Sequence, residues 1–156
     1  MNKNTFSNRV TWYLVTRTFS KLFSMAGCRL GYVVGHPDEI KMVQKLCTPH
    51  NTNAFAMLVA QKILETPGIL SSLIEDYTLG RDYLIKELNS HKYLHKGDAG
   101  NFIFIKPKTN ALTIVEKMKS QKQILIKSYS NVGNGTCLRV TIGAKQYMER
   151  FFRCFI

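Results

Sequence analysis

The sequence predicts an α/β fold in two parts. Short runs of β-branched and aromatic residues alternate with longer segments whose apolar residues recur at helical spacing. Hydrophobic residues make up 45% and charged residues 21% of the chain, a balance typical of a globular protein with a sizeable core. Pro67 and Gly68 interrupt the pattern. We therefore expect one part to cover residues 1–66 and the other to cover residues 67–156.

Two short strands are expected in the first part. The run WYLVTRTF at 12–19 combines aromatic and β-branched residues and predicts a buried strand that leads into a Ser/Lys turn. The run LGYVVG at 30–35 predicts a second strand between glycines, with Tyr32 in the core. No further strand is predicted before residue 67. Either the sheet partners of these strands lie outside the chain, or the assignment is wrong.

Two helices follow the second strand. Residues 36–47 predict a helix because Pro37 suits its first turn, and acidic residues beside it suit the positive end of the helix dipole. Residues 51–65 predict another, whose opening Asn-Thr-Asn offers an N-cap. Residues 54–60 are apolar on all sides of this helix, which indicates burial on more than one face.

The second part is expected to be a helix followed by a β-α-β-β-α unit. Apolar spacing predicts the first helix at 69–89. The elements after it are a strand at 101–106, a helix at 110–121, strands at 124–129 and 137–143, and a helix at 144–156. The last helix is amphipathic and carries on its apolar side Tyr147, Met148, Phe151, Phe152 and Phe155.

Charge and cysteine usage narrow the possible functions. The net charge of +12 comes from lysines and arginines spread along the chain, so we expect no nucleic-acid partner but attraction of small anions. No apolar run approaches the roughly 18 residues that span a bilayer, and the first residues are too polar for a signal peptide, so we expect a cytoplasmic protein without membrane contact. The four cysteines show no metal-ligand spacing, which predicts buried, reduced thiols and no metal site.

The stretch TRTFSKLFSMAGCRLGY, residues 16–32, carries the chemistry. Lys21 lies at the exit of a strand, with Thr18 and Ser20 before it and Arg29 eight residues after it. A lysine amine forms a Schiff base with an aldehyde, and hydroxyls with an arginine fork bind a phosphate. The alternatives are a surface lysine, an arginine in an ion pair, and hydroxyls that satisfy the turn backbone.

This stretch resembles the lysine segment of fold-type I pyridoxal-phosphate enzymes, aminotransferase classes I and II, and most of all the histidinol-phosphate aminotransferase branch. Two later segments extend the resemblance. The run NFIFIK at 101–106 is similar to an N-F-[IV]-[LF] strand of that family, and CLRVTIG at 137–143 is similar to its L-R-[IV]-[TS]-[VI]-G strand. Their order and spacing match, so the resemblance covers nearly the whole chain from about Val15.

The resemblance implies a role for each of five residues. Lys21 matches the Schiff-base lysine, which then moves a proton on the substrate. Ser20 and Arg29 match ligands of the cofactor phosphate, and Thr18 is expected to join them. Arg139 matches the arginine that pairs with the substrate α-carboxylate; the alternative is a charge on a sheet strand. The implied cofactor is pyridoxal 5'-phosphate, and no metal is implied.

The resemblance also implies an architecture and a reaction. Residues 1–66 correspond to the C-terminal end of a large pyridoxal-phosphate-binding domain, and residues 67–156 to a small α/β domain. The implied activity is amino transfer between an amino acid, or an amino alcohol phosphate, and a 2-oxo acid in amino-acid biosynthesis. Family members are homodimers, and the apolar helix at 51–65 is a candidate for part of that interface.

Two departures from the family pattern limit these expectations. The large domain that precedes the lysine segment in the family supplies an Asp to the pyridine nitrogen and further cofactor contacts, and these are not in the chain. The fragment is therefore expected to be inactive or nearly so alone. Lys127 stands where relatives often have Arg, so no substrate role is assigned to it. The alternatives are a catalytically dead remnant of the fold, or a related pyridoxal-phosphate decarboxylase or lyase.

Overall fold

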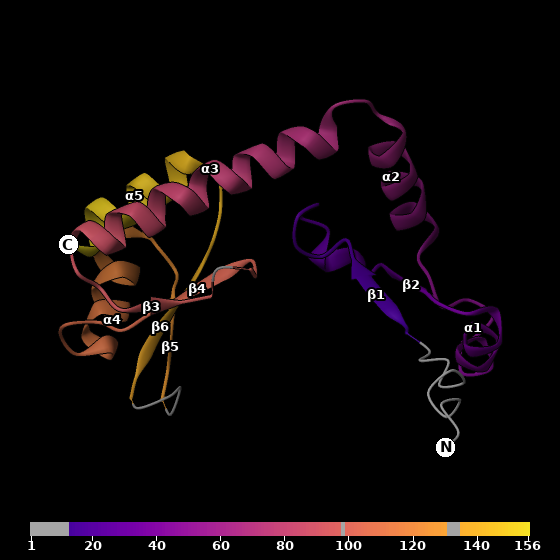
Figure 1. Ribbon diagram of the computed structural model, residues 1–156, viewed down its shortest axis with the longest axis horizontal. Coiled ribbons are helices and arrows are strands. Elements are labelled where there is room, and N and C mark those ends of the chain that lie inside the picture. The colour runs from indigo at the N-terminus through magenta and orange to yellow at the C-terminus, as the bar shows by residue number, and fades with distance from the viewer. Residues whose placement is uncertain (1–12, 98, 131–134) are drawn as a thin grey trace, which may run out of the picture. The chain divides into compact units, whose positions relative to one another are not determined.

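The computed structural model describes residues 13–97, 99–130 and 135–156. The chain divides into two compact units, Met1–Thr66 and Pro67–Ile156, and each is described here by itself. Figure 1 labels the helices and strands of both. Among the described residues, no helix is both long and apolar enough to cross a membrane.

The first unit contains a two-stranded antiparallel ribbon. Strand β1 (Val15–Thr18) pairs with β2 (Gly31–Val34), and Thr18 lies opposite Gly31. Both predicted strands are confirmed, and they pair with each other. Further sheet partners outside the chain stay a prediction. The expected burial is wrong. All four residues of β1 are exposed, and Tyr32 of β2 is 52% exposed, because a two-stranded ribbon leaves both of its faces open.

A small apolar core holds the ribbon against one helix. Helix α2 (Ala54–Glu65) begins at Asn53, whose side-chain Oδ1 accepts hydrogen bonds from the N–H groups of the second and third helical residues. Its Ala56 and Ala60 are buried together with three residues of the segment between the strands, Phe19, Met25 and Leu30. Small residues on this side of the helix let the segment approach the helix backbone closely.

The opposite faces of α2 are exposed, so the expectation of burial on several faces is wrong for the described unit. Phe55 is 80% exposed, and the large apolar residues Met57, Leu58, Val59 and Leu64 are exposed as well. Only the two alanines of the helix are buried. Large apolar side chains that no other described part of the unit covers indicate an interaction surface.

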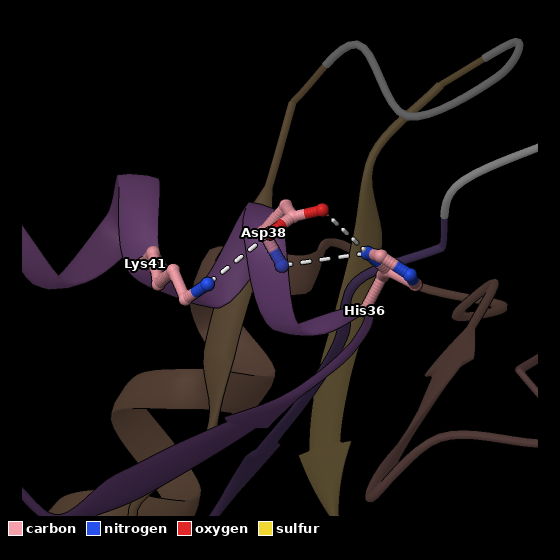
Figure 2. A network of polar contacts seen from close by, with 3 residues as sticks. All are labelled: His36, Asp38 and Lys41. Atoms are coloured by element: carbon pink, nitrogen blue, oxygen red, sulfur yellow. Dashed lines mark hydrogen bonds and ion pairs between the residues drawn. The ribbon is translucent and has the colours of Figure 1, made fainter.

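Helix α1 (Pro37–Gln44) begins with a local polar network, shown in Figure 2. The His36 Nδ1 accepts a hydrogen bond from the Asp38 N–H at 3.4 Å and lies 3.6 Å from Asp38 Oδ2. The Lys41 Nζ lies 3.4 Å from Asp38 Oδ1. These groups are exposed and their separations are long, so the network marks the start of the helix and adds little stability.

The second unit is built on a four-stranded antiparallel sheet in the order β3-β4-β6-β5. Its strands are β3 (His95–Lys96), β4 (Phe102–Ile105), β5 (Lys127–Tyr129) and β6 (Cys137–Thr141). The three strands expected from the sequence are confirmed, although β5 starts later than expected. The two-residue strand β3 was not predicted, because two residues carry no recognisable alternation.

Three helices cover one face of this sheet: α3 (Ile69–Ser90), α4 (Ala111–Lys122) and α5 (Lys145–Phe155). Helices α3 and α5 run side by side in Figure 1. The shared core consists of Leu84, Leu88, Ile103, Ile105, Ala111, Met118, Leu138, Val140, Ile142, Met148, Phe151, Phe152 and Phe155. The predicted apolar side of α5 is therefore confirmed, except for Tyr147, which is 59% exposed.

The cysteines are free thiols, as the sequence predicts. The expected burial is wrong, because Cys28 and Cys47 are exposed and Cys137 and Cys154 are only half-buried. Cys28 closes the 3-10 turn η1 (Ala26–Cys28), and Cys47 follows α1, so both belong to connections rather than to packed elements.

Candidate active site

The segment between β1 and β2 brings four predicted site residues into one connection. Thr18 ends β1, Ser20 and Lys21 follow it, and Arg29 lies two residues before β2. Buried Phe19 sits within this group and holds the segment to the small core. The buried apolar residues therefore anchor the segment, and the polar ones remain available.

Backbone hydrogen bonds fix the shape of this connection. The Phe19 N–H donates to the Leu30 carbonyl at 3.1 Å, and the Met25 N–H donates to the Phe19 carbonyl at 3.1 Å. The three residues that make these bonds are also buried. The lysine therefore lies in a turn that is closed at its base and packed from within.

The two hydroxyls have different surroundings. The Thr18 Oγ1 accepts a hydrogen bond from the Ser20 N–H at 3.0 Å, which supports its role in the turn backbone. A hydroxyl also has a proton to donate, so this bond leaves Thr18 able to bind an anion. Ser20 is half-buried, and its hydroxyl has no hydrogen-bond partner within residues 13–97, 99–130 and 135–156.

Arg29 combines an available guanidinium with an uncommon backbone conformation. Its φ of 53° lies in the left-handed region, as does that of Ser24 in the same connection. The Arg29 Nη1 donates to the Ala26 carbonyl at 3.2 Å, and no ion pair of Arg29 occurs in the described part of the chain. The remaining guanidinium donors suit an anion, and clustered backbone strain is a feature of functional sites.

The charge of this segment also suits an anion. The sequence contains no Asp or Glu before Asp38, whereas Arg17, Lys21 and Arg29 all lie in or beside the connection. Without a nearby carboxylate, the positive potential is not cancelled locally. An amine, two hydroxyls and a guanidinium on one anchored segment fit an aldehyde that carries a phosphate, which is the chemistry of the expected cofactor.

Arg139 belongs to the second unit and lies on the open face of its sheet. In β6 it lies between Leu138 and Val140, which are buried under the helices, so its side chain projects from the other face. It lies directly opposite Phe104 of β4 and Lys127 of β5. Among the described residues it forms no ion pair.

Sequence reasoning missed the aromatic surroundings of Arg139. Its Cζ lies over the Phe102 ring, 4.1 Å from the ring centroid. Alternation along β4 puts Phe102 and Phe104 on one face, but the sequence holds no signal for the strand register that brings Arg139 to that face beside them. Lys127, to which no role was assigned, is its neighbour on the other side.

Comparisons with known proteins agree with this architecture. The family profile described as "Aminotransferase class I and II" matches residues 4–154. A histidinol-phosphate aminotransferase from Moorella thermoacetica is 30% identical over 140 residues, covering 90% of this chain and 36% of that protein. A dihydroxyacetone phosphate transaminase from Campylobacter jejuni is 28% identical over 143 residues, covering 87% and 37%.

A solved structure extends the comparison to the fold. It is a histidinol-phosphate aminotransferase from Sinorhizobium meliloti in complex with pyridoxal-5'-phosphate, with a TM-score of 0.74 and 20% identity, covering 88% of this chain and 38% of that one. The predicted α/β fold of pyridoxal-phosphate transferases is confirmed. The chain spans little more than a third of the length of the curated relatives that it matches. The profile match runs over almost all of its length, and the chain therefore belongs to the aminotransferase class I and II family.

Proposed function

We propose that this chain carries the cofactor lysine and the substrate-carboxylate arginine of a pyridoxal-phosphate-dependent aminotransferase. The reaction would transfer an amino group between an amino acid, or an amino alcohol phosphate, and a 2-oxo acid. One observation carries the proposal: Lys21 shares an anchored, acid-free connection with Thr18, Ser20 and Arg29. The family is pyridoxal-phosphate-dependent, and curated relatives near 30% identity are named aminotransferases, which favours amino transfer over a related decarboxylase or lyase.

Lys21 is the central residue of the proposed mechanism. Pyridoxal 5'-phosphate, when bound, supplies an electron sink that stabilises negative charge at the substrate α-carbon. The Lys21 Nζ would hold the cofactor aldehyde carbon covalently. Once the substrate amine has released it, the same nitrogen is a general base that moves a proton between two carbon atoms. The exposure of Lys21 in this connection leaves its amine accessible.

The other residues bind and orient. The Thr18 and Ser20 hydroxyls and the Arg29 guanidinium would hold the cofactor phosphate, with the arginine fork donating two parallel hydrogen bonds. Arg139 would bind the substrate α-carboxylate in the same bidentate way. A permanently charged partner fixes the orientation of the substrate before the proton moves.

The whole protein's assembly is part of the proposal. We assign Met1–Thr66 to the end of a large cofactor-binding domain and Pro67–Ile156 to a small domain. The exposed apolar faces of α2 support docking of α2 in a homodimer. Since the chain spans little more than a third of its relatives, we expect little turnover from it alone. The cytoplasmic location stays a prediction.

Reductive labelling tests the site directly. The chain is incubated with pyridoxal 5'-phosphate, reduced with borohydride, and mapped by peptide mass spectrometry. We expect label at Lys21 in excess over the other lysines, and we expect pyridoxal, which lacks the phosphate, to lose that selectivity. The Arg29→Ala variant should lose it as well, whereas Lys41→Ala, the same loss of one positive charge at an exposed residue, should not.

Two outcomes would contradict the proposal. Label scattered over many lysines would mean that the segment does not recognise the cofactor. If Lys21 is labelled as selectively by pyridoxal as by pyridoxal 5'-phosphate, the phosphate group is not recognised. The phosphate-binding roles proposed for Thr18, Ser20 and Arg29 would then be wrong, even though Lys21 reacts.

A further inference from the structure

The Arg139 side chain makes a specific contact with an aromatic ring. Its Cζ lies 4.1 Å from the centroid of the Phe102 ring. Phe102 pairs with Thr141, two residues along β6 from Arg139, so the two residues are diagonal neighbours on the open face of the sheet. Long and aromatic side chains reach each other across such a diagonal. The strand register therefore favours this contact.

The Phe102 ring is itself held by other rings. Phe102 packs edge to face on Phe104, with centroids 5.2 Å apart and planes at 76°. Phe104 packs in the same way on Tyr129, at 6.1 Å and 87°. Such edge-to-face pairs are favourable arrangements of aromatic rings. The ring under the Arg139 guanidinium thus belongs to a row of three packed aromatic rings from β4 and β5.

We propose that Phe102 is a positioning residue for Arg139, which it holds ready to bind a carboxylate; the inference rests on the proposed carboxylate role of Arg139. An arginine side chain carries large rotamer entropy, which binding must otherwise remove. A ring restrains the guanidinium through a cation–π contact without saturating its N–H donors. Because no carboxylate of the described chain pairs with Arg139, those donors remain for a ligand.

NMR of the Arg139 side chain tests this inference on the chain itself. The Arg139 Nε–Hε signal is assigned from its loss in the Arg139→Lys variant. The chain is then titrated with sodium acetate while this signal is followed, and a titration with sodium chloride at equal ionic strength is the control. We expect a saturable shift with acetate only. Phe102→Leu should raise the acetate dissociation constant about fivefold, the effect of losing a moderate cation–π contact.

Matched variants distinguish a role of Phe102 in positioning Arg139 from a general role in packing on this sheet face. Phe102→Tyr keeps the ring and should bind acetate within about twofold of the original chain. Tyr129→Leu removes another ring from the same sheet face, one that makes no cation–π contact with Arg139 in the described part of the chain, and should also stay within about twofold. In the original chain the ring current of Phe102 should displace the Arg139 Hε signal, and Phe102→Leu should abolish this displacement.

The outcomes distinguish the two proposals. If acetate does not shift the Arg139 signal, the carboxylate role is wrong, and the positioning role falls with it. If acetate binds normally but Phe102→Leu leaves its affinity unchanged, or lowers it no more than Tyr129→Leu, only the positioning role is overturned. The ring-current shift is measured on the original chain, so the inference remains testable even if Phe102→Leu fails to fold. If the Arg139 Hε signal of the original chain shows no ring-current displacement, the inference is overturned.

Discussion

Arg29, a proposed phosphate ligand in the lysine segment, has a left-handed backbone conformation. A left-handed φ of 53° is unfavourable for a residue with a Cβ, and the surrounding bonds of the connection must maintain it. Glycine would adopt the same conformation without this cost. An arginine at this position is explained if its guanidinium binds a ligand, because glycine has no side chain to do so. This agrees with the proposed contact with the cofactor phosphate.

Variants at this position separate backbone strain from charge. Arg29→Gly removes the strain and Arg29→Ala retains it, so we expect the glycine variant to be more stable by about 1 kcal/mol. Both variants should lose selective cofactor labelling at Lys21. Urea unfolding followed by circular dichroism measures the first effect. Equal unfolding midpoints for the two variants would show that the left-handed conformation is not maintained in solution.

Tyr83 gives the second unit a pH dependence. Burial raises the pKa of its phenol above the ordinary value of 10.0, and the carboxylates of Glu87 and Glu149 raise it further, opposed by Arg153. As pH rises past 10, the unfolded chain loses this proton first, while the folded chain keeps it. The folded state then binds more protons, so its stability falls as pH increases from the unfolded pKa to the folded pKa.

The Tyr83→Phe variant isolates this contribution. Between pH 9 and pH 11 we expect the free energy of unfolding to fall less steeply for the variant than for the original chain. Below the unfolded pKa the two pH profiles should run parallel. Urea titrations at each pH provide the measurement, and other alkaline titrations cancel in the comparison. Parallel profiles over the whole range would contradict the assignment to Tyr83.

Among the elements, helix α3 depends on one glycine. Gly80 is buried at the point where α3 meets the start of α5, and a Cβ there would collide with the Gly143 carbonyl and lie 3.1 Å from the Ala144 carbonyl carbon. Backbone atoms cannot rotate away as a flexible side chain would. From the sequence alone Gly80 interrupts the apolar stripe of a helix, whereas in the structure it permits close packing.

The Gly80→Ala variant should therefore be destabilising, although alanine favours helix formation. We expect a loss of about 1–3 kcal/mol from overpacking, in excess of the roughly 1 kcal/mol gained in helix propensity. Ser72→Ala, at an exposed position of the same helix, is the control and should stabilise slightly or leave stability unchanged. Thermal unfolding compares the two, and a more stable Gly80→Ala would mean that α5 packs elsewhere.

The elements also show where sequence reasoning succeeded and where it failed. Long amphipathic helices such as α3 and α5 were predicted because periodicity over many residues is a strong signal. The burial of β1 and of α2 was predicted wrongly, because an apolar pattern reports a preference for burial and not what covers it. The Phe102 contact depends on register between strands far apart in sequence, which no local pattern encodes.

At the scale of the whole molecule, the two units differ in how much core each possesses. The second unit buries residues from three helices and two strands, β4 and β6, in one continuous cluster. Among residues 13–66 of the first unit, two alanines and three larger residues form the buried core, while large apolar side chains on β1, β2 and α2 are exposed. Burial of apolar surface is the main driving force of folding, so the units should differ in independent stability.

Separate expression of the two units tests this difference. We expect residues 67–156 to fold alone and to unfold in one cooperative transition, because their core is complete within the described unit. Residues 1–66 should show weak near-ultraviolet circular dichroism, no cooperative transition, and a tendency to associate through α2. A polar variant of α2, Phe55→Ser with Leu58→Ser, should reduce association without changing the second unit. If residues 1–66 unfold cooperatively as a monomer, then the ribbon and α2 are stable without a partner, and the docking role proposed for the exposed faces of α2 is wrong.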